Sequence, residues 1–549
     1  MAGTRLHVVV SFVLFALAVA PFAWRFTQIE RVELPVARIR RLSFQDSRFA
    51  QPEAFAIAVF SLDSQTPKSQ ALAAVGGDNG ARVTFTPVET LEATPAQRQA
   101  LLRATSLQEL DDRLAPLAPP DRFSILLLCS AAPPVAIAAS GADANALVVG
   151  RHRHAWSTQC AFPRGSALVR AAEALALEHV FPSAASSEST AGKRAARTAV
   201  RYRLQFALLK ENAQLAWRWP FANALFPRFL GRFVAKVSVL ANFTVESEVL
   251  HYARLAKEIH ATSDGSAFYV KADDLKQFKS ANDFLTSTVL DDREQVLHFM
   301  AALPALEHSP LGIQASDEPG RLASAFEIPG WGGVAILNTT RLLSGRAEDA
   351  ALEVKKLMGV FLTQLRTLLG APSFHERQRA AARDPRAKLV FLPSPRDGIA
   401  DWEIDVIARA RFKHYLRASI TTLQSIVQLV DEMTQMSVLE RVQQRVEAAV
   451  TLIEDILCTG AELELATRQC AASADLHALL AKAREAADHT DAAYYDHTMI
   501  RQLYFPQEQM FGVYAPLLAP LILPFFVGLV REFRRWKKKK AEKLKGASA

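Results

Sequence analysis

Two long apolar runs lie at opposite ends of the chain, and nearly all of the polar sequence lies between them. Residues 6–24 form an apolar run that is interrupted only by His7 and Ser11, and residues 511–530 contain no charged side chain. As helices with a rise of about 1.5 Å per residue, runs of this length cover the roughly 30 Å hydrocarbon core of a bilayer. The pattern therefore predicts two transmembrane helices, which would keep the intervening residues against one face of a membrane.

The first run has a second interpretation, because a basic start and small residues before Pro21 also resemble a secretory signal peptide. A proline directly after Ala20 disfavours cleavage at that position, and the run is long for the hydrophobic part of a signal peptide. We therefore expect residues 6–24 to remain in the mature chain as a membrane anchor.

The charges beside the two runs predict which side of the membrane the central residues occupy. Residues 531–549 contain nine Lys or Arg against two Glu, and they supply +7 of the net charge of +8. Basic residues next to a span stay in the cytosol, so residues 1–5 and 531–549 are expected there and residues 25–510 in the lumen or outside the cell. A smaller basic cluster at residues 38–41 favours the opposite orientation. Since the central residues are nearly neutral, composition gives no sign of a nucleic-acid-binding surface.

The N-terminal part of the central region alternates strand-like and helix-like segments. Residues 55–60, 123–129 and 146–149 are short, continuous apolar runs, as expected of buried strands. Residues 96–114 and 167–181 carry apolar side chains three and four positions apart, which predicts helices. Buried strands that alternate with helices predict a mostly parallel or mixed sheet covered on both faces.

The pattern changes after a small, polar stretch at residues 182–192, which we expect to be a surface loop. Residues 202–208 alternate apolar and polar side chains, as a half-exposed strand does. Four further segments look strand-like: 233–240, 267–270, 296–300 and 333–337. An amphipathic helix is predicted over residues 347–369, and Gly370 can end it in the left-handed conformation. Its apolar stripe consists of Leu352, Leu357, Phe361, Leu365 and Leu368.

Residues 396–505 contain no proline and only two glycines, which predicts a long helical segment. Apolar residues recur every three or four positions from Trp402 onward, and a further helix is expected over residues 474–487. We interpret the apolar stripe as intramolecular core. The predicted order is a luminal α/β body over residues 25–395, followed by a luminal helical segment over residues 396–510.

A search for catalytic motifs gives a largely negative result. The sequence contains no GxxxxGK[ST] loop, GxGxxG turn, HExxH helix, CxxC pair or GxSxG elbow. Cys160, with His152 and His154 shortly before it, is the best nucleophile candidate and would suit a membrane-tethered luminal cysteine hydrolase. We favour a structural cysteine with surface histidines, and the two histidines lack a third metal ligand nearby. We therefore predict no catalytic, cofactor-binding or metal-binding residue.

Four cysteines in 549 residues are too few for a disulfide scaffold. Cys129 lies in an apolar, strand-like run and is expected to be a buried thiol. An oxidising lumen would permit a disulfide between Cys458 and Cys470, but the sequence does not require one.

Two further features suit a glycosylated membrane protein. Asn242 and Asn338 each begin an Asn-x-Thr sequon and are predicted glycosylation sites on the luminal side. Pro516, Pro520 and Pro524 recur every four residues inside the second apolar run, so they share one helix face. Prolines leave carbonyls without donors, which is unfavourable in lipid, so we expect this face to pack against other protein or polar groups.

Several motifs resemble the PIG-S family. They are LYFPQEQ at residues 503–509, YAPL at residues 514–517 followed by the triple-proline run, WGG at residues 331–333, and KLMGVFLTQLR at residues 356–366. The arrangement of span, luminal region and span also fits that family from end to end, whereas residues 25–200 match only by architecture.

The resemblance implies a double-pass protein of the endoplasmic reticulum membrane that is a non-catalytic subunit of glycosylphosphatidylinositol (GPI) transamidase. That complex attaches GPI anchors to the C-termini of precursor proteins. The resemblance implies four kinds of partner: the caspase-like PIG-K subunit, which carries the Cys–His chemistry, and the PIG-T, PIG-U and GAA-type subunits. It gives no catalytic residue to this chain. Besides the hydrolase, a luminal chaperone or glycan-binding module is a further alternative.

Overall fold

The computed structural model of the chain describes most of the central region and isolated parts of the two ends. The described residues are 11, 14, 32–43, 54–61, 84–85, 89–91, 94–119, 122–129, 134–140, 146–159, 166–180, 195–255, 258–262, 265–277, 294–314, 322–382, 388–433, 436–457, 475–499, 516, 519–520, 523, 526–531, 533–538 and 540. Most of the predicted spans 6–24 and 511–530, the predicted loop 182–192 and three of the four cysteines lie outside them. Among the residues described, no helix combines the length and apolar character needed to cross a bilayer.

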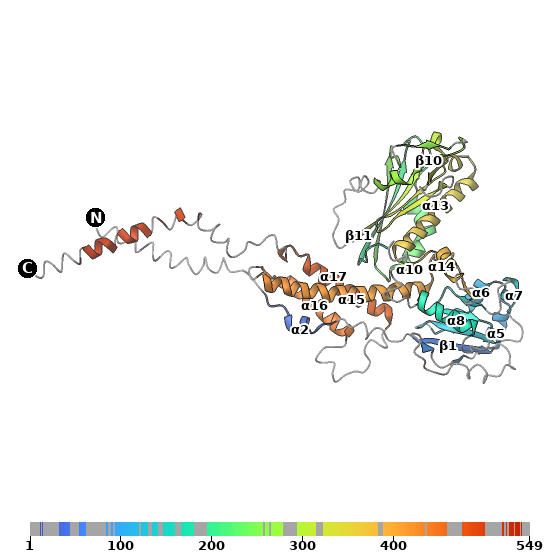
Figure 1. Cartoon of the computed structure of the whole chain (residues 1–549), viewed down its shortest axis with the longest axis horizontal. Helices are drawn as coiled ribbons and strands as arrows, with labels where there is room; N and C mark the ends of the chain where they lie inside the picture. The colour runs from blue at the N-terminus through green and yellow to red at the C-terminus, as the bar shows by residue number, and fades with distance from the viewer. Residues whose placement is uncertain are drawn as a thin grey trace, which may run out of the picture. The chain divides into compact units, whose positions relative to one another are not determined.

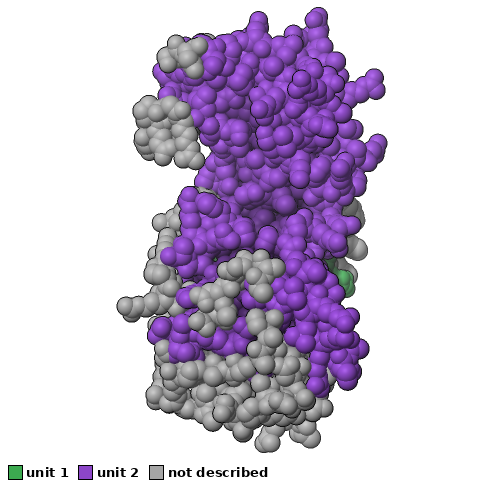
Figure 2. All heavy atoms as spheres, turned by 90° about the vertical axis from the view of Figure 1, so that its right-hand side faces the viewer, with its two compact units in different colours: residues 1–43, 417–455, 485–549 green, residues 44–416, 456–484 purple. Residues whose placement is uncertain are grey.

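The chain forms two compact units, which Figure 2 shows in different colours. Unit 1 combines residues 1–43, 417–455 and 485–549, and unit 2 combines residues 44–416 and 456–484. The division falls inside helix α15 (Asp401–Glu432), between Leu416 and Arg417.

Unit 2 contains a mixed sheet of seven strands. In spatial order they are β16 (Leu389–Phe391), β5 (Leu147–Val149), β6 (His154–Ser157), β4 (Ser124–Cys129), β1 (Ala54–Ser61) and β2 (Thr84–Phe85), with β3 (Glu89–Leu91) also paired to β1. β6, β4, β1, β2 and β3 are parallel to one another, whereas β5 pairs antiparallel to β6 and parallel to β16. The predicted strands at residues 55–60, 123–129 and 146–149 are confirmed.

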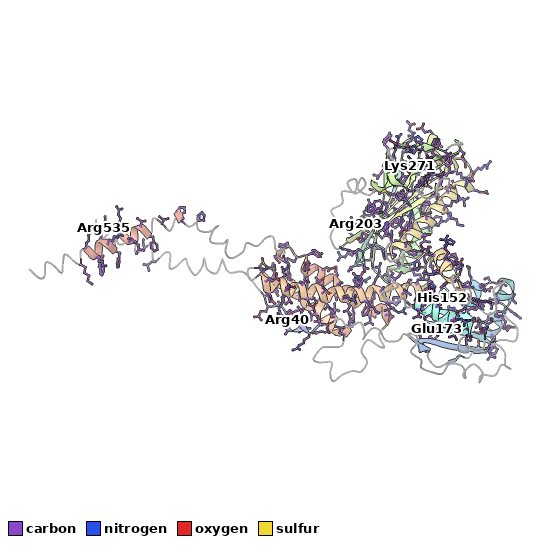
Figure 3. All side chains as sticks on the ribbon, viewed as in Figure 1. Arg40, His152, Glu173, Arg203, Lys271 and Arg535 are labelled. Atoms are coloured by element: carbon purple, nitrogen blue, oxygen red, sulfur yellow. The ribbon has the colours of Figure 1, made fainter. Side chains whose placement is uncertain are left out.

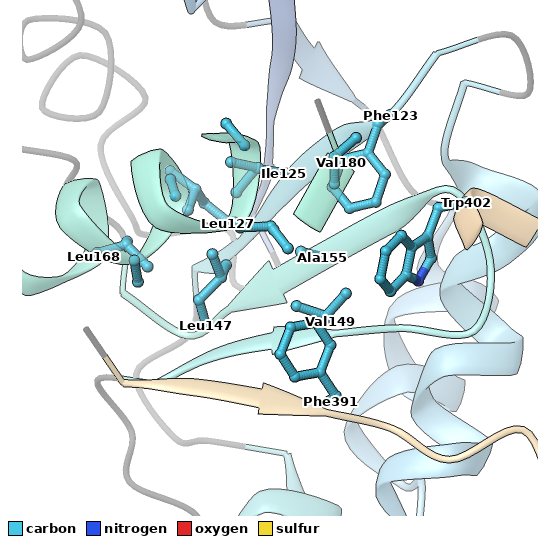
Figure 4. Close-up of a cluster of buried hydrophobic side chains, with 14 of the residues drawn as sticks. Phe123, Ile125, Leu127, Leu147, Val149, Ala155, Leu168, Val180, Phe391 and Trp402 are labelled. Carbon is cyan, nitrogen blue, oxygen red and sulfur yellow. The ribbon is translucent and has the colours of Figure 1, made fainter. Parts of the chain in front are cut away.

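Helices cover both faces of this sheet. Alternate apolar side chains of β4 point to opposite faces, so each face can pack against helices. Ile125, Leu127 and the thiol of Cys129 join one buried cluster with α8 (Ala167–Ala174) and Trp402, which Figure 4 shows. Leu126 and Leu128 join the other cluster, with α5 (Pro95–Leu102), α6 (Leu107–Leu114) and α7 (Val135–Ser140). The helix predicted over residues 96–114 is in fact two helices, α5 and α6. The second begins at Ser106, whose side chain accepts a hydrogen bond from Glu109 N and caps it.

A second sheet in unit 2 has five strands in the order β14 (Ala325–Ile328), β15 (Gly332–Ile336), β11 (Glu294–Leu303), β7 (Arg201–Lys210) and β8 (Asn242–His251). All pairs are parallel except β14 with β15. A small sheet has the order β13 (Leu322–Ala323), β12 (Leu311–Gln314), β10 (Phe268–Lys271) and β9 (His260–Ala261).

The five-stranded sheet is covered by helices on one face and packs against residues of the small sheet on the other. On the helical face, Phe206 of β7 stacks on Phe221 and Phe299 at centroid distances of 4.4 and 4.9 Å, and Phe361 lies 5.7 Å away. Phe221 belongs to the π-helical segment η4 (Phe221–Leu230) and Phe361 to α13 (Ala347–Leu368), which runs beside this sheet in Figure 1. On the other face, Met300 of β11 belongs to a buried cluster that includes β10 and β12.

Two predictions in this region are wrong. Residues 202–208 are not half-exposed, because the sheet is covered on both faces and seven of the ten residues of β7 in succession are buried. Residues 233–240 are not a strand but include helix α10 (Gly231–Val237), whose Phe233 and Val237 are buried at helical spacing. The predicted helix over residues 347–369 is confirmed as α13, and Gly370 follows it with φ of 96°. Leu352 departs from its predicted stripe, since it is 46% exposed.

Unit 1 is helical where it is described. It contains α2 (Val36–Arg41), the second part of α15, α16 (Glu440–Leu457) and the end of α17 (Leu476–Tyr494). Arg38 of α2 donates to Glu454 of α16 at 2.6 Å. The stripe predicted as core along α15 is buried at most positions: Trp402, Leu416, Ile420, Leu423, Val427 and Val430.

Candidate functional site

The first five residues of α15 carry three carboxylates at alternate positions: Asp401, Glu403 and Asp405. We refer to these three residues as the acidic turn. Side chains two positions apart on a helix are separated by about 200°, so the carboxylates point toward different neighbours. Negative charge is also favourable at a helix N-terminus, where the backbone amides leave a partial positive charge.

Glu403 joins α15 to two other helices of unit 2. It is 3% exposed and accepts hydrogen bonds from Arg366 of α13 at 2.6 Å and from the Ala400 amide at 2.6 Å. It also forms an ion pair with Arg377 of α14 (Phe374–Ala381). Burial alone would raise the pKa of Glu403, but the two guanidinium groups lower it below its usual value. The carboxylate is therefore ionised and compensated by two buried cations.

Asp401 connects the start of α15 to the β5–β6 turn and to helix α10. His152, from the turn between β5 and β6, lies with Nδ1 2.8 Å from Asp401 Oδ2, and Lys236 Nζ of α10 lies 2.7 Å from Oδ1. Burial would raise the pKa of Asp401, but the hydrogen bonds from His152 and Lys236 bring it down to about 2. The hydrogen bond to Asp401 in turn raises the pKa of His152. Figure 3 labels His152.

Asp405 lies one turn after Asp401, on the side of the helix opposite Glu403. Arg153 Nε lies 2.6 Å from its Oδ2, and His477 Nε2 of α17 lies 3.0 Å from its Oδ1. Burial opposes ionisation of Asp405, but these two partners lower its pKa. Through the acidic turn, α15 therefore contacts the β5–β6 turn, α10, α13, α14 and the start of α17.

The β5–β6 turn is itself fixed by a buried aspartate. Asp111 of α6 is fully buried, and its Oδ2 accepts from the Arg151 amide at 3.0 Å while its Oδ1 lies 2.9 Å from His154 Nε2. Gly150 is needed here, because a Cβ at this position would lie 2.0 Å from Asp111 Oδ1. The sequence prediction that His154 is a surface residue is wrong, since it is fully buried beside this carboxylate.

This region also brings together ligand types that the sequence left apart. Asp111, Asp112 and His152 each place a ligand atom within 4.8 Å of the others, although sequence reasoning found no third ligand near the histidines. Arg151 forms ion pairs with both carboxylates. Its guanidinium already supplies the positive charge that a metal ion would bring, so the arrangement favours an ion-pair network over a metal centre.

The remaining predicted site residues lie in different places. Asn242 is the exposed first residue of β8. Asn338 is partly buried and caps α12 (Thr339–Leu342), accepting from the Arg341 amide at 3.1 Å. Pro516 and Pro520 have helical backbone and exposed side chains, whereas Pro524 and Cys160 lie outside the described residues.

Within the part of the chain that is described, the buried carboxylates of this region lie beside cationic groups or histidines, although Asp111 Oδ1 and both ring nitrogens of His154 make no hydrogen bond of good geometry. These internal ion pairs form a structural framework.

Comparison with known families defines the class of protein. Residues 10–539 match the model of the family PIG-S, described as phosphatidylinositol-glycan biosynthesis class S protein. The chain belongs to this family.

Relatives with similarity over nearly their whole length include the GPI-anchor transamidase component PIGS of Mus musculus. It is 26% identical over 95% of this chain and 94% of the relative. The Bos taurus component of the same name is 27% identical, with 94% of this chain and 93% of the relative covered. The GPI transamidase component PIG-S homolog of Schizosaccharomyces pombe is 21% identical over 64% of this chain and 57% of the relative.

The sequence reasoning missed the residues of the acidic turn as a group. The usable signal was local: three acidic residues at alternate positions at the start of a predicted helix, which is typical of a helix N-terminus. Their partners come from up to about 250 residues earlier in the chain, such as Arg153, and no sequence pattern indicates those pairings.

Proposed function

We propose that this chain is a subunit of a GPI transamidase complex and acts in it as a non-catalytic scaffold. The observation that carries the proposal is similarity over almost the full length to proteins named as GPI-anchor transamidase components. Because the similarity extends from one apolar run to the other, it supports a shared role of the whole chain rather than of one module.

The acidic turn supports the scaffold part of the proposal. Three carboxylates and their cationic partners connect α15 to the β5–β6 turn of the seven-stranded sheet and to helices α10 and α13. Buried, paired charges require good geometry and therefore favour one specific arrangement of the elements they join. A scaffold needs such a fixed arrangement, since it must present surfaces to several partners at once.

The remaining features of the proposal come from the sequence. The chain is a double-pass protein of the endoplasmic reticulum membrane with both termini in the cytosol, residues 6–24 and 511–530 as spans, and the bulk in the lumen. Its partners are the caspase-like PIG-K subunit and the PIG-T, PIG-U and GAA-type subunits. The precursor protein and the GPI lipid meet within the complex. Pro516, Pro520 and Pro524 form a packing face in the membrane, so their joint replacement by Leu weakens assembly and leaves membrane insertion intact.

A deletion and rescue experiment tests the assignment. The gene is deleted in the cells that carry it, and surface levels of a GPI-anchored reporter are measured after the full-length chain is returned. We expect the reporter to disappear on deletion and to return with the wild-type chain. Unchanged surface reporter after deletion would contradict the proposal.

Cys160→Ala separates the scaffold from a cysteine hydrolase. The two histidines that would assist Cys160 are committed to other groups, His152 to Asp401 and His154 to Asp111. We therefore expect the Cys160→Ala chain to restore the reporter as well as wild type. Failure to restore it, with normal abundance and normal assembly, would favour the hydrolase.

A further inference from the structure

β8 is an edge strand that differs in length from the other edges of the described sheets. Edge strands expose unpaired backbone amides and carbonyls, and proteins commonly protect themselves by keeping such strands short. The other edge strands have two to four residues: β2, β3, β9, β13, β14 and β16. β8 has ten residues, and among the described strands only β7 pairs with it.

The register shows which backbone groups of β8 face outward. Asn242 donates its amide to the Val200 carbonyl at 3.0 Å, and the strand then continues in regular parallel register with β7 to His251. Hydrogen-bonding direction alternates along a strand. The amides and carbonyls of Phe243, Val245, Ser247 and Val249 therefore point away from β7.

β8 carries two charged side chains, Glu246 and Glu248, but none of the residues that most often block an edge. Its sequence, NFTVESEVLH, contains no proline, glycine, lysine or arginine, although lysine and proline are the common guards against pairing. Val249 is 37% exposed. The strand thus combines open backbone groups with apolar surface and two negative charges.

A strained and exposed tyrosine directly follows the strand. Tyr252 has φ of 59° and is 78% exposed, and it is the only non-glycine residue with positive φ in the described part of the chain. This left-handed conformation disfavours a bulky side chain and suits glycine. Exposure removes any contribution of the ring to the core, so the fold itself gives no reason for tyrosine here. Exposed tyrosines are frequent anchors of protein interfaces.

We propose that β8 and Tyr252 form a docking edge for an extended segment of another subunit of the transamidase. That segment adds a strand beside β8, with its backbone pairing to the outward amides and carbonyls. Glu246 and Glu248 point to the same face of the sheet, and the strand itself carries no positive side chain. The incoming segment therefore carries Lys or Arg opposite these glutamates, and apolar side chains beside Val249 and Tyr252.

Neighbouring groups set the limits of this edge. Arg203 of β7, labelled in Figure 3, pairs with Glu294 at 2.6 Å and lies 3.6 Å from Glu246, whose side chain remains 47% exposed. Gln205 donates to Glu248 at 2.9 Å. A glycan on Asn242 would cover the start of the strand and leave residues 245–252 for docking. The inference rests on the proposed membership of a complex.

Site-specific photo-crosslinking tests the inference in the full-length chain. Benzoylphenylalanine replaces Val249, the chain substitutes for the native copy in cells, and the complex is irradiated and purified in mild detergent. We expect one cross-linked peptide from another transamidase subunit, and this peptide should come from an extended segment that contains a basic residue. The same probe at Val135, which is 55% exposed on α7 beside the seven-stranded sheet, should not capture that peptide.

The outcomes separate this inference from the proposed function. If subunits co-purify but residue 249 captures nothing, or captures a second copy of this chain, the precursor or lipid, the docking edge is wrong and membership of the complex stands. If no transamidase subunit co-purifies with the wild-type chain, both proposals fail.

Substitutions at two positions, residues 249 and 252, distinguish docking from folding. Val249→Pro removes an outward amide without touching the pairing to β7, whereas Val249→Thr keeps the amide and the shape. Of these two, only Val249→Pro should strongly reduce co-purification of the subunit that the probe at residue 249 captures. Tyr252→Gly should weaken binding by about 30-fold, as for loss of a central aromatic anchor, while its thermal midpoint stays at or above wild type because the backbone strain is relieved. Unchanged recovery with both Val249→Pro and Tyr252→Gly would overturn the inference.

Discussion

Glu403→Gln tests whether the acidic turn stabilises unit 2. The substitution keeps the size of the side chain and an acceptor for the Ala400 amide, but it removes the charge that compensates Arg366 and Arg377. Their side chains are only 9% and 7% exposed, so both cations remain buried without their counter-ion. Breaking a buried ion pair by removing one partner costs about 3–5 kcal/mol. We expect a loss of about 4 kcal/mol, which is a large fraction of the roughly 5–15 kcal/mol that stabilises a typical domain.

Proteolysis of the purified full-length chain across a urea gradient measures this loss. With a slope of about 3 kcal/mol per molar urea, a loss of about 4 kcal/mol lowers the unfolding midpoint by about 1.3 M. Lys356→Gln is the control, on the α13 helix that carries Arg366, because it removes a cation that is 53% exposed from an ion pair with Glu353. Glu353 keeps a second cation, Arg341, at 3.7 Å, so loss of the solvated Lys356 should cost less than about 1 kcal/mol and the control midpoint should stay close to wild type.

A double variant makes the reasoning refutable even if the single variant is difficult to purify. Arg377 contacts Glu403 and lies over the Trp402 ring at 4.7 Å. Replacing Arg377 by Met in the Glu403→Gln background removes a buried, uncompensated cation, so the double variant should be at least as stable as Glu403→Gln. Additive losses from the two substitutions, or a Glu403→Gln midpoint equal to that of Lys356→Gln, would refute the account.

His152, Phe361 and the two sequon asparagines each allow a further test. The hydrogen bond to Asp401 raises the pKa of His152 above 6.5, so the stabilisation from this pair is complete below about pH 6.5 and is lost as the pH rises through the pKa of the folded state. The thermal midpoint of His152→Gln should therefore fall furthest below that of wild type at acidic pH. A difference in midpoint that does not change with pH would contradict this. Phe361→Ala should cost about 3–5 kcal/mol in urea unfolding, since the ring is fully buried among other rings; a loss below about 1 kcal/mol would count against that core. Asn242→Gln and Asn338→Gln should each remove one endoglycosidase-sensitive step in gel mobility, and unchanged mobility would exclude a glycan at that position.

The parts of the fold that could be predicted are those where local pattern and burial agree. β4 is continuously apolar because both of its faces are covered, and α13 repeats its buried residues at helical spacing and ends at a glycine. The error at α10 has the same origin, since Phe233, Val234 and Val237 also suit a strand when only a short window is read. The sequence predicts a half-exposed strand at residues 202–208 because Arg203 and Gln205 alternate with apolar residues near its start, but the later residues of β7 are continuously buried.

The acidic turn could be predicted only in part. Its position at a helix start follows from the sequence, but its partners depend on how the two sheets meet α15. Asp401 pairs with His152, which lies in a turn 249 residues earlier. Its other partner, Lys236, lies in α10, where the sequence predicts a strand. The sequence offers His152 and His154 only as possible helpers of Cys160 and favours surface positions for them, because the carboxylates beside them, Asp111 and Asp401, come from elements that only the tertiary structure brings together.

Affinity purification of the full-length chain in mild detergent, with the recovered proteins identified and quantified by mass spectrometry, tests the central claim most directly. The account predicts stoichiometric recovery of a caspase-like luminal subunit together with multi-span membrane partners. Recovery of this chain alone, under conditions in which the caspase-like subunit is shown to remain intact in the same extract, would contradict membership of a GPI transamidase.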